Sequence, residues 1–248
     1  MNDVEHLERA PIAEAILDWR VEPAEGITVD AFAEVESRLA DELPQRRIGK
    51  LVQGVFEIRE GELLAQDPPE SVEYGLLLRS ADDKRVAQFR VDGFSVNQLH
   101  PYPGWDDLYS AALRWWALYA ELAAPKRVVR LAARYVNRFT LPSSTEDLED
   151  WLSAPPPIPE HLPQTLSQFL TRVTIHDAKT GNAAHVTQTM EANPNANEIV
   201  LILDIDAFRA VSVQTDSGKI AETLASLRAL KNQIFFECVT ENALELFR

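Results

Sequence analysis

The chain has 248 residues, of which 46% are hydrophobic and 25% are charged, a balance that is typical of globular proteins and excludes intrinsic disorder. Its formal net charge of −15 argues against nonspecific binding to nucleic acid or to an anionic membrane, because both need clustered Lys and Arg. The single cysteine, Cys238, excludes an intramolecular disulfide framework and a multi-cysteine zinc site.

The first half of the chain predicts a strand, a helix, three further strands and a second helix. In chain order these are strand 12–21, helix 29–43, strands 51–60, 74–80 and 85–98, and helix 105–123. Strands are inferred from apolar alternation and helices from apolar residues at helical spacing. Thr28 is expected to cap the first helix and Pro44 to end it. Asp92-Gly93-Phe94 is interpreted as a bulge within one long strand.

The same order then repeats in the second half. In chain order the expected elements are strand 127–141, short helix 146–152, strands 168–177, 184–191 and 199–205, a long helix from about Ser217 and a final short helix to Phe247. Thr145 and Thr240 are expected to cap the two short helices. We therefore predict an α+β fold of two pseudo-repeated β-α-β-β-β-α halves, residues 1–124 and 125–248, joined in one continuous structural unit. The alternative is a chance succession of similar segments, because the halves share no residue-level identity.

Two such halves are expected to form an antiparallel sheet, because the apolar stripe of each long helix needs a sheet face to cover it. We expect this sheet to be curved, with the long helices packed on one face, its concave side. Cavities beside such a sheet are where folds of this kind bind ligands.

Four segments of the chain carry a family resemblance. They are Ala10–Pro23, which contains Pro-Ile-Ala-Glu-Ala; Val91–Phe94 with Pro101–Trp105; Arg134–Phe139, which contains Arg-Tyr-Val-Asn-Arg; and Asn232–Glu237 followed by Thr240-Glu241. On these segments the chain resembles a sporadically distributed bacterial family of conserved hypothetical proteins, over nearly its whole length. The resemblance implies the same boundaries as above, and it implies no established activity, cofactor or catalytic residue.

The strands that open the two halves carry rows of charge. These are Glu14, Asp18 and Arg20 on the first strand, and Arg130, Arg134 and Arg138 on the second. If the two strands lie side by side and antiparallel, their carboxylates face guanidiniums. The structural interpretation pairs Glu14 with Arg134 or Arg130 in a partly buried network that joins the halves. The functional alternative is that the arginines bind an anionic ligand, with Asn137 or Tyr135 nearby.

Two histidines are the only candidates for a metal site. If the turn between their strands is centred between Thr180 and Gly181, His176 and His185 lie directly opposite each other, within reach of one metal ion. A lasting zinc site needs three or four protein ligands, and no third ligand is evident. The expected interpretation is therefore a solvent-exposed pair, with no metal and no cofactor.

Aromatic residues near the second helix suggest a surface. Tyr102 and Trp105 either form a lip over a pocket or fix the loop before the helix to the sheet. Trp115 and Trp116 are consecutive and cannot both face inward on one helix. One of them, with Tyr119, is therefore expected to form an exposed apolar patch for a dimer or a protein partner.

No catalytic or phosphate-binding motif is present, and the chain has nine glycines, too few for a rich nucleotide-cradling loop. We interpret the protein as a non-enzymatic binding or regulatory protein whose partner is another protein or a second copy. The alternative is a binder of small anionic molecules, or a hydrolase, that uses a sheet–helix cavity with Arg134, Asn137 and Glu14 as polar anchors. The acidic N-terminus and the lack of an apolar span predict a cytoplasmic location, away from membranes.

Overall fold

The computed structural model describes residues 7–53, 56–59, 62–65, 70–142, 147–164, 166–191 and 198–248. Its strands are β1 (Ile12–Glu22), β2 (Gln45–Gln53), β3 (Phe56–Arg59), β4 (Glu62–Ala65), β5 (Glu70–Arg79), β6 (Arg85–Arg90), β7 (Gly93–Leu99), β8 (Arg127–Pro142), β9 (Leu170–Asp177), β10 (Asn182–Glu191) and β11 (Glu198–Val213). Nine of them form one antiparallel sheet in the order β2-β5-β6-β7-β1-β8-β11-β10-β9, and β3 pairs with β4 apart from it. With its helices the chain is an α+β protein, as expected.

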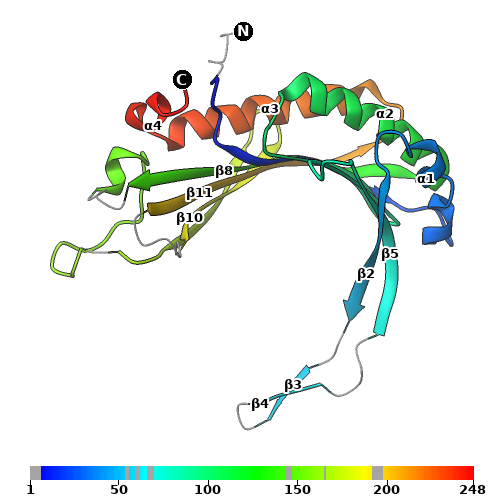
Figure 1. Ribbon diagram of the computed structural model, residues 1–248, viewed down its shortest axis with the longest axis horizontal. Helices are drawn as coiled ribbons and strands as arrows, with labels where there is room; N and C mark the ends of the chain where they lie inside the picture. The colour runs from blue at the N-terminus through cyan, green and yellow to red at the C-terminus, as the bar shows by residue number, and fades with distance from the viewer. Residues whose placement is uncertain are drawn as a thin grey trace.

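The helices lie over the outside of an arched sheet. They are the 3-10 helices η1 (Val29–Phe32) and η2 (Leu148–Asp150) and the α-helices α1 (Val35–Arg38), α2 (Trp105–Ala123), α3 (Gly218–Cys238) and α4 (Glu241–Glu245). In Figure 1 the arch opens away from α2 and α3, so these helices lie on its convex side and the expectation of the concave side is wrong. No helix of the described residues is long and apolar enough to cross a membrane.

Strands β1 and β8 pair at the middle of the sheet. They run antiparallel, with Ile16 opposite Arg134 and Asp18 opposite Ala132. The prediction that the two charged strands are neighbours is therefore confirmed. The alternating sequence of β1 sends charged side chains to the inside of the arch and apolar ones towards the helices.

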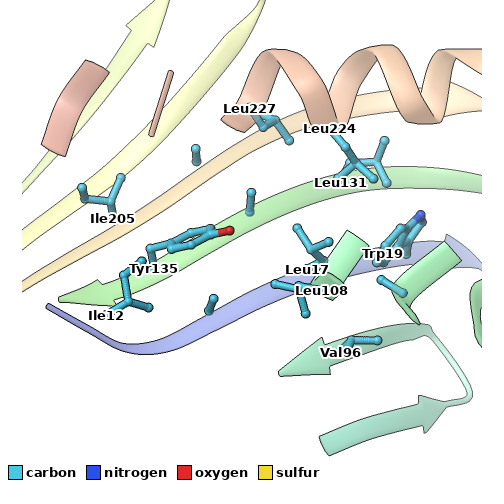
Figure 2. Packing of buried hydrophobic residues seen from close by; sticks show 14 of the residues in the cluster. Ile12, Leu17, Trp19, Val96, Leu108, Leu131, Tyr135, Ile205, Leu224 and Leu227 are labelled. Carbon is cyan, nitrogen blue, oxygen red and sulfur yellow. The ribbon is translucent and has the colours of Figure 1, made fainter. Parts of the chain in front are cut away.

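The core fills the space between the sheet and the helices. Leu17 and Trp19 of β1 are fully buried, and Trp19 stacks on Trp116 of α2 with ring centroids 5.5 Å apart. Figure 2 shows Leu17, Trp19, Leu131 of β8 and Leu224 of α3 projecting into this layer. Burying each such side chain contributes about 1.5–3 kcal/mol, so this layer fixes where α2 and α3 lie on the sheet.

The helix expected at 29–43 is broken into two short helices, η1 and α1. Thr28 makes no side-chain capping bond. The apolar stripe of the segment 29–43 is nevertheless buried. The Phe32 ring lies against those of Phe89 and Tyr119, with ring centroids 5.9 and 5.7 Å apart. A helix of this length is only marginally stable by itself, so the packing of its individual side chains determines the backbone conformation.

The strand expected at 85–98 is in fact a hairpin. Strands β6 and β7 reverse through Val91-Asp92, and Arg90 pairs with Gly93. The two residues of the turn are Val91 and Asp92, and Gly93 is the first residue of β7, so the interpretation of Asp92-Gly93-Phe94 as a bulge within one strand is wrong. Gly93 is required here because a Cβ at this position would lie 2.3 Å from the Trp19 carbonyl oxygen.

Other boundaries differ from expectation in smaller ways. The strand expected at 51–60 overlaps the end of β2 and all of β3, and residues 54, 55 and 60 lie outside the described residues. Strand β11 continues to Val213, well past the expected end at 205. The short helix expected at 146–152 is the single turn η2, whose cap is Asp147, and Thr145 lies outside the described residues.

The other predicted helix ends agree with the structure. Helix α2 has the expected bounds. The Ser217 hydroxyl accepts a hydrogen bond from the Lys219 amide at the start of α3. The Thr240 hydroxyl accepts one from the Ala243 amide at the start of α4.

The exposed aromatic patch expected on α2 is absent from the described structure. Trp115, Trp116 and Tyr119 are 2%, 5% and 0% exposed. Both tryptophans are buried because α2 is covered on two sides, by the sheet and by the η1 segment. Trp116 also donates a hydrogen bond of 3.0 Å to the Thr215 carbonyl oxygen in the second half of the chain.

Candidate functional site

The sheet divides the predicted site residues between its two faces. Asn137 and Tyr135 point towards α3 and are buried, whereas Glu14, Arg130 and Arg134 point into the arch. Residues 134 and 137 are three positions apart on one strand, so they must lie on opposite faces. The hypothesis that Arg134, Asn137 and Glu14 anchor one ligand is therefore wrong.

Inside the arch the charges form a network of ion pairs. Asp18 accepts a hydrogen bond of 2.6 Å from Arg90 Nη2 and lies 3.5 Å from Arg130 Nη1. Arg130 Nη2 also lies 3.0 Å from Asp206 Oδ2. Asp18 thus joins β1 of the first half to β8 of the second half, which is the kind of link that the charge rows predicted.

The predicted partner of Glu14 is wrong. Glu14 Oε1 accepts a hydrogen bond of 2.7 Å from Asn97 Nδ2, whereas Arg134 binds Asp204 through two hydrogen bonds of 2.9 and 2.6 Å. Arg134 turns away because β11 pairs with the other edge of β8 and brings Asp204 and Asp206 to it. Its hydrogen bonds to Asp204 raise the pKa of the Arg134 guanidinium.

This pairing limits what the arch can bind. A hollow of about 630 Å³ lies over these residues. An anion entering it would compete with carboxylates that already bind Arg90, Arg130 and Arg134. The arch face is therefore better explained as architecture than as an anion site.

A second cavity, of about 560 Å³, lies on the helix side of the sheet. Its walls are residues 7–12, the loop 100–105, Tyr135 and Asn137 of β8, Ile205 of β11, and α3 residues between Arg228 and Phe236. In Figure 2 Tyr135 and Ile205 project from adjacent strands on this side. Both halves of the chain thus contribute to one cavity.

Two cationic side chains of α3 line this cavity and contact aromatic rings. The Lys231 ammonium lies 3.7 Å from the centroid of the Tyr135 ring, and the Arg228 guanidinium lies 5.0 Å from that of Trp105. Among the described residues no carboxylate lies within 4.0 Å of either charge. The cavity wall also contains the exposed residues Glu8 and Arg9, and Arg9 donates to the Arg248 carbonyl oxygen.

The environment of Lys231 disfavours its charged form. The residue is half-buried as a whole, but its ammonium lies over a ring that is only 1% exposed. Burial, and secondarily the nearby Arg228, lower the pKa of Lys231 to about 7. The π face of Tyr135 acts in the opposite direction, because it attracts a cation.

Two tyrosines form the polar floor of the cavity. The Tyr102 and Tyr135 hydroxyls are hydrogen-bonded at 2.9 Å, and their rings meet edge to face at 5.6 Å. Burial raises the pKa of both hydroxyls, so both stay protonated. Asn137 Nδ2 donates to the Leu203 carbonyl oxygen at 3.0 Å, which fixes its side chain.

The loop that carries Tyr102 and Trp105 places both residues at the cavity. Gln98 Nε2 donates to the Pro101 carbonyl oxygen at 3.3 Å, which holds the loop, and Trp105 stacks on Tyr109 at 5.4 Å. Tyr102 and Trp105 therefore border the cavity and pack against neighbouring rings at the same time.

Comparison of the sequence with models of protein families gives no match, and comparison with curated proteins gives none. The resemblance inferred from four segments therefore stays a prediction.

The two histidines are not opposite each other. His176 pairs with Ala183 and His185 with Thr174, because the turn is centred between Lys179 and Thr180. His185 Nδ1 lies 2.9 Å from the Thr174 hydroxyl. Among the described residues no group of three or more His, Cys, Asp or Glu side chains could hold a metal ion.

Sequence reasoning missed the cations of α3, although a signal was present. The apolar stripe of this helix runs through Ile220, Leu224, Leu227 and Ile234, and at helical spacing position 231 belongs to it. A lysine within a buried stripe is unusual, because burying an unpaired ammonium is unfavourable.

Proposed function

We propose that this protein binds a small anionic organic molecule in the cavity between α3 and the sheet. The observation that carries the proposal is that Arg228 and Lys231 line this cavity with aromatic rings, not carboxylates, as their contacts. An anion would give these charges the partner that the chain itself does not place within 4.0 Å among its described residues.

The charge balance of the chain makes this observation informative. The sequence has 39 acidic and 24 basic side chains, so carboxylates are plentiful. Many arginines elsewhere in the described structure bind them, as Arg90 binds Asp18 and Arg114 binds Glu42. Arg228 is exposed at the cavity mouth, whereas Lys231 is partly withdrawn from water. A charged group that is withdrawn from water without a counter-ion is costly, and such groups often mark ligand sites.

The remaining walls are suited to the organic part of a ligand. Phe235, Phe236 and Ile205 contribute apolar surface, while Tyr102 and Asn137 contribute polar groups. Small-molecule sites typically combine a mostly apolar cavity of this size with a few polar groups that fix orientation.

Isothermal titration calorimetry with a panel of aliphatic and aromatic carboxylates tests the proposal. Lys231→Met and Arg228→Gln are each expected to weaken binding by about tenfold or more, the loss of one charge-assisted contact. Arg134→Gln, on the opposite face, is the matched control and is expected to bind like the wild type. Equal binding by all three variants, or no saturable binding at all, would contradict the proposal.

We also propose that the two halves are pseudo-repeats. Support comes from the strand order. Reading outward from the centre gives β1-β7-β6-β5, with β2 added at the edge, in one direction and β8-β11-β10-β9 in the other. The long helices α2 and α3 follow the equivalent strands β7 and β11. The cavity lies where these two equivalent helices approach each other, which is a common place for a binding site to arise.

A second candidate function is association with a second copy through β9. This edge strand exposes Leu170, Val173 and Ile175, which are 71%, 55% and 39% exposed. Exposed apolar edge strands favour pairing with another strand. The masses of wild type and Val173→Lys by light scattering test this: a dimer that the substitution dissociates supports it, and a monomeric wild type at all concentrations removes it.

A further inference from the structure

We propose that Lys231 binds oxo acids covalently, as an imine between its Nζ and the carbonyl carbon of a ligand whose carboxylate contacts Arg228. This inference rests on the proposed anion site and names its ligand class. It follows from an amine and a guanidinium that line the same cavity with no carboxylate of the described residues within 4.0 Å of either charge.

The position of Lys231 favours a nucleophilic amine. Lysines that form imines lie in desolvated pockets or beside another cation, so that the neutral amine is populated. Lys231 meets both conditions, because its amine lies over the buried Tyr135 ring and Arg228 is nearby. In agreement, the pKa of Lys231 is lowered to about 7.

The position of Arg228 favours a ligand that carries a carboxylate close to its carbonyl group. Residues 228 and 231 are three apart on α3, and side chains at this spacing lie on neighbouring positions of one helix face, with Cβ atoms about 5–6 Å apart. A guanidinium binds a carboxylate through two parallel hydrogen bonds and so orients the rest of the molecule. A short oxo acid therefore presents its carbonyl carbon towards the amine.

The reaction is a condensation that needs no oxidant or reductant. The lone pair of the neutral Lys231 Nζ attacks the carbonyl carbon, the C–N bond forms as the C=O π bond breaks, and one amine proton passes to the oxygen. The resulting hydroxyl takes the second amine proton and leaves as water, and the C=N bond forms. The Tyr102 and Tyr135 hydroxyls line the same cavity as a hydrogen-bonded pair, so they can relay a proton from the nitrogen to the departing oxygen.

Reductive trapping of the full chain tests the inference. The protein is incubated with pyruvate and cyanoborohydride, and modified lysines are located by peptide mass spectrometry. The exposed lysines Lys84, Lys126, Lys179 and Lys219 are internal controls. Lys231 is expected to be labelled at least about tenfold faster than Lys219 on the same helix. Labelling of Lys231 no faster than Lys219 would overturn the inference.

Two further measurements separate this inference from the proposed function. Arg228→Gln is expected to slow the labelling of Lys231 by pyruvate more than by propanal. Propanal has no carboxylate, so its labelling loses only the effect of the Arg228 charge on the amine. Equal slowing by both would overturn the role of Arg228. Lactate, which has no carbonyl group outside its carboxylate, tests the anion site alone. Lactate binding without pyruvate labelling would contradict the imine and leave the proposed anion site standing. If lactate does not bind and pyruvate does not label Lys231, both proposals are contradicted.

Discussion

Lys231 occupies a position in α3 where a hydrophobic residue would pack better. Its neighbours in the stripe, Leu227 and Ile234, are 0% and 6% exposed. Because folded proteins rarely bury an ammonium without a carboxylate, Lys231 is expected to lower the stability of the fold.

Lys231→Met is expected to stabilise the protein near neutral pH. The pKa of Lys231 is about 7 in the folded chain and 10.5 as the ordinary value, so the folded state binds fewer protons between these pH values. The unfavourable contribution of Lys231 is therefore largest below about pH 7 and disappears as the pH rises past about 10. We expect a gain of about 1–3 kcal/mol at pH 7 that shrinks towards pH 10.

Urea denaturation at several pH values measures this gain, with the exposed Lys219→Met as the control. A gain that is equal at about pH 6.5 and pH 9.5 would contradict the desolvation of Lys231.

Asp18 is the residue on which the arch network depends. Its side chain is 15% exposed and contacts Arg90 and Arg130. Asp18→Ala is expected to lower the free energy of unfolding by about 3 kcal/mol, because two partly buried guanidiniums lose a carboxylate at once. Among the described carboxylates, Arg130 then keeps only Asp206, and Arg90 keeps only a contact of 3.6 Å with Asp92. Glu22→Ala, which breaks more exposed pairs with Lys126 and Arg127, should cost less. Equal losses in chemical denaturation would show that the network adds nothing beyond surface pairs.

At the scale of elements, the close approach of β7 to β1 depends on Gly93. A Cβ there would lie 2.3 Å from the Trp19 carbonyl oxygen. This oxygen belongs to the backbone of a central strand, so moving it away is energetically costly. Gly93→Ala is therefore expected to cost about 2 kcal/mol or more, since it forces apart the pairing of two central strands.

Gly218→Ala is the matched control for Gly93→Ala. Nothing lies within 4 Å of a Cβ at Gly218, which begins α3. Alanine is the better helix former, so this variant should be as stable as the wild type or slightly more stable. Thermal denaturation followed by circular dichroism compares the two, and a harmless Gly93→Ala would refute the steric argument.

Elements whose own residues specify them could be predicted well. Helix α2 has a long amphipathic stripe that ends before a proline, and α3 and α4 are capped by Ser217 and Thr240. The segment 29–43 has a similar stripe but is too short to be stable alone, so its contacts with Phe89 and Tyr119 decide its shape.

For the whole molecule, the halves 1–124 and 125–248 are expected to fold as one cooperative unit. The central pairing of β1 with β8 joins the two halves, and Trp116 of the first half donates a hydrogen bond to the Thr215 carbonyl oxygen of the second. Thermal unfolding should therefore show one transition that coincides by circular dichroism and tryptophan fluorescence. Two separated transitions, or a fragment 1–124 with native-like fluorescence, would show that the halves are independent.

The local properties of this protein could be predicted from its residue order. Alternation, helical spacing and capping residues identified most strands and the long helices, and two charge rows identified β1 and β8 as neighbours. These signals are encoded within single segments, where the periods of 2 and 3.6 residues make them visible.

Only the tertiary structure decided which side chains share a site. Glu14 and Arg134 separate because β7 brings Asn97 and β11 brings Asp204, and the cavity joins Tyr102, Tyr135 and Lys231 from three distant segments. Strand order and helix placement follow from burial summed over the whole core, and burial is not directional, so no single segment contains that information.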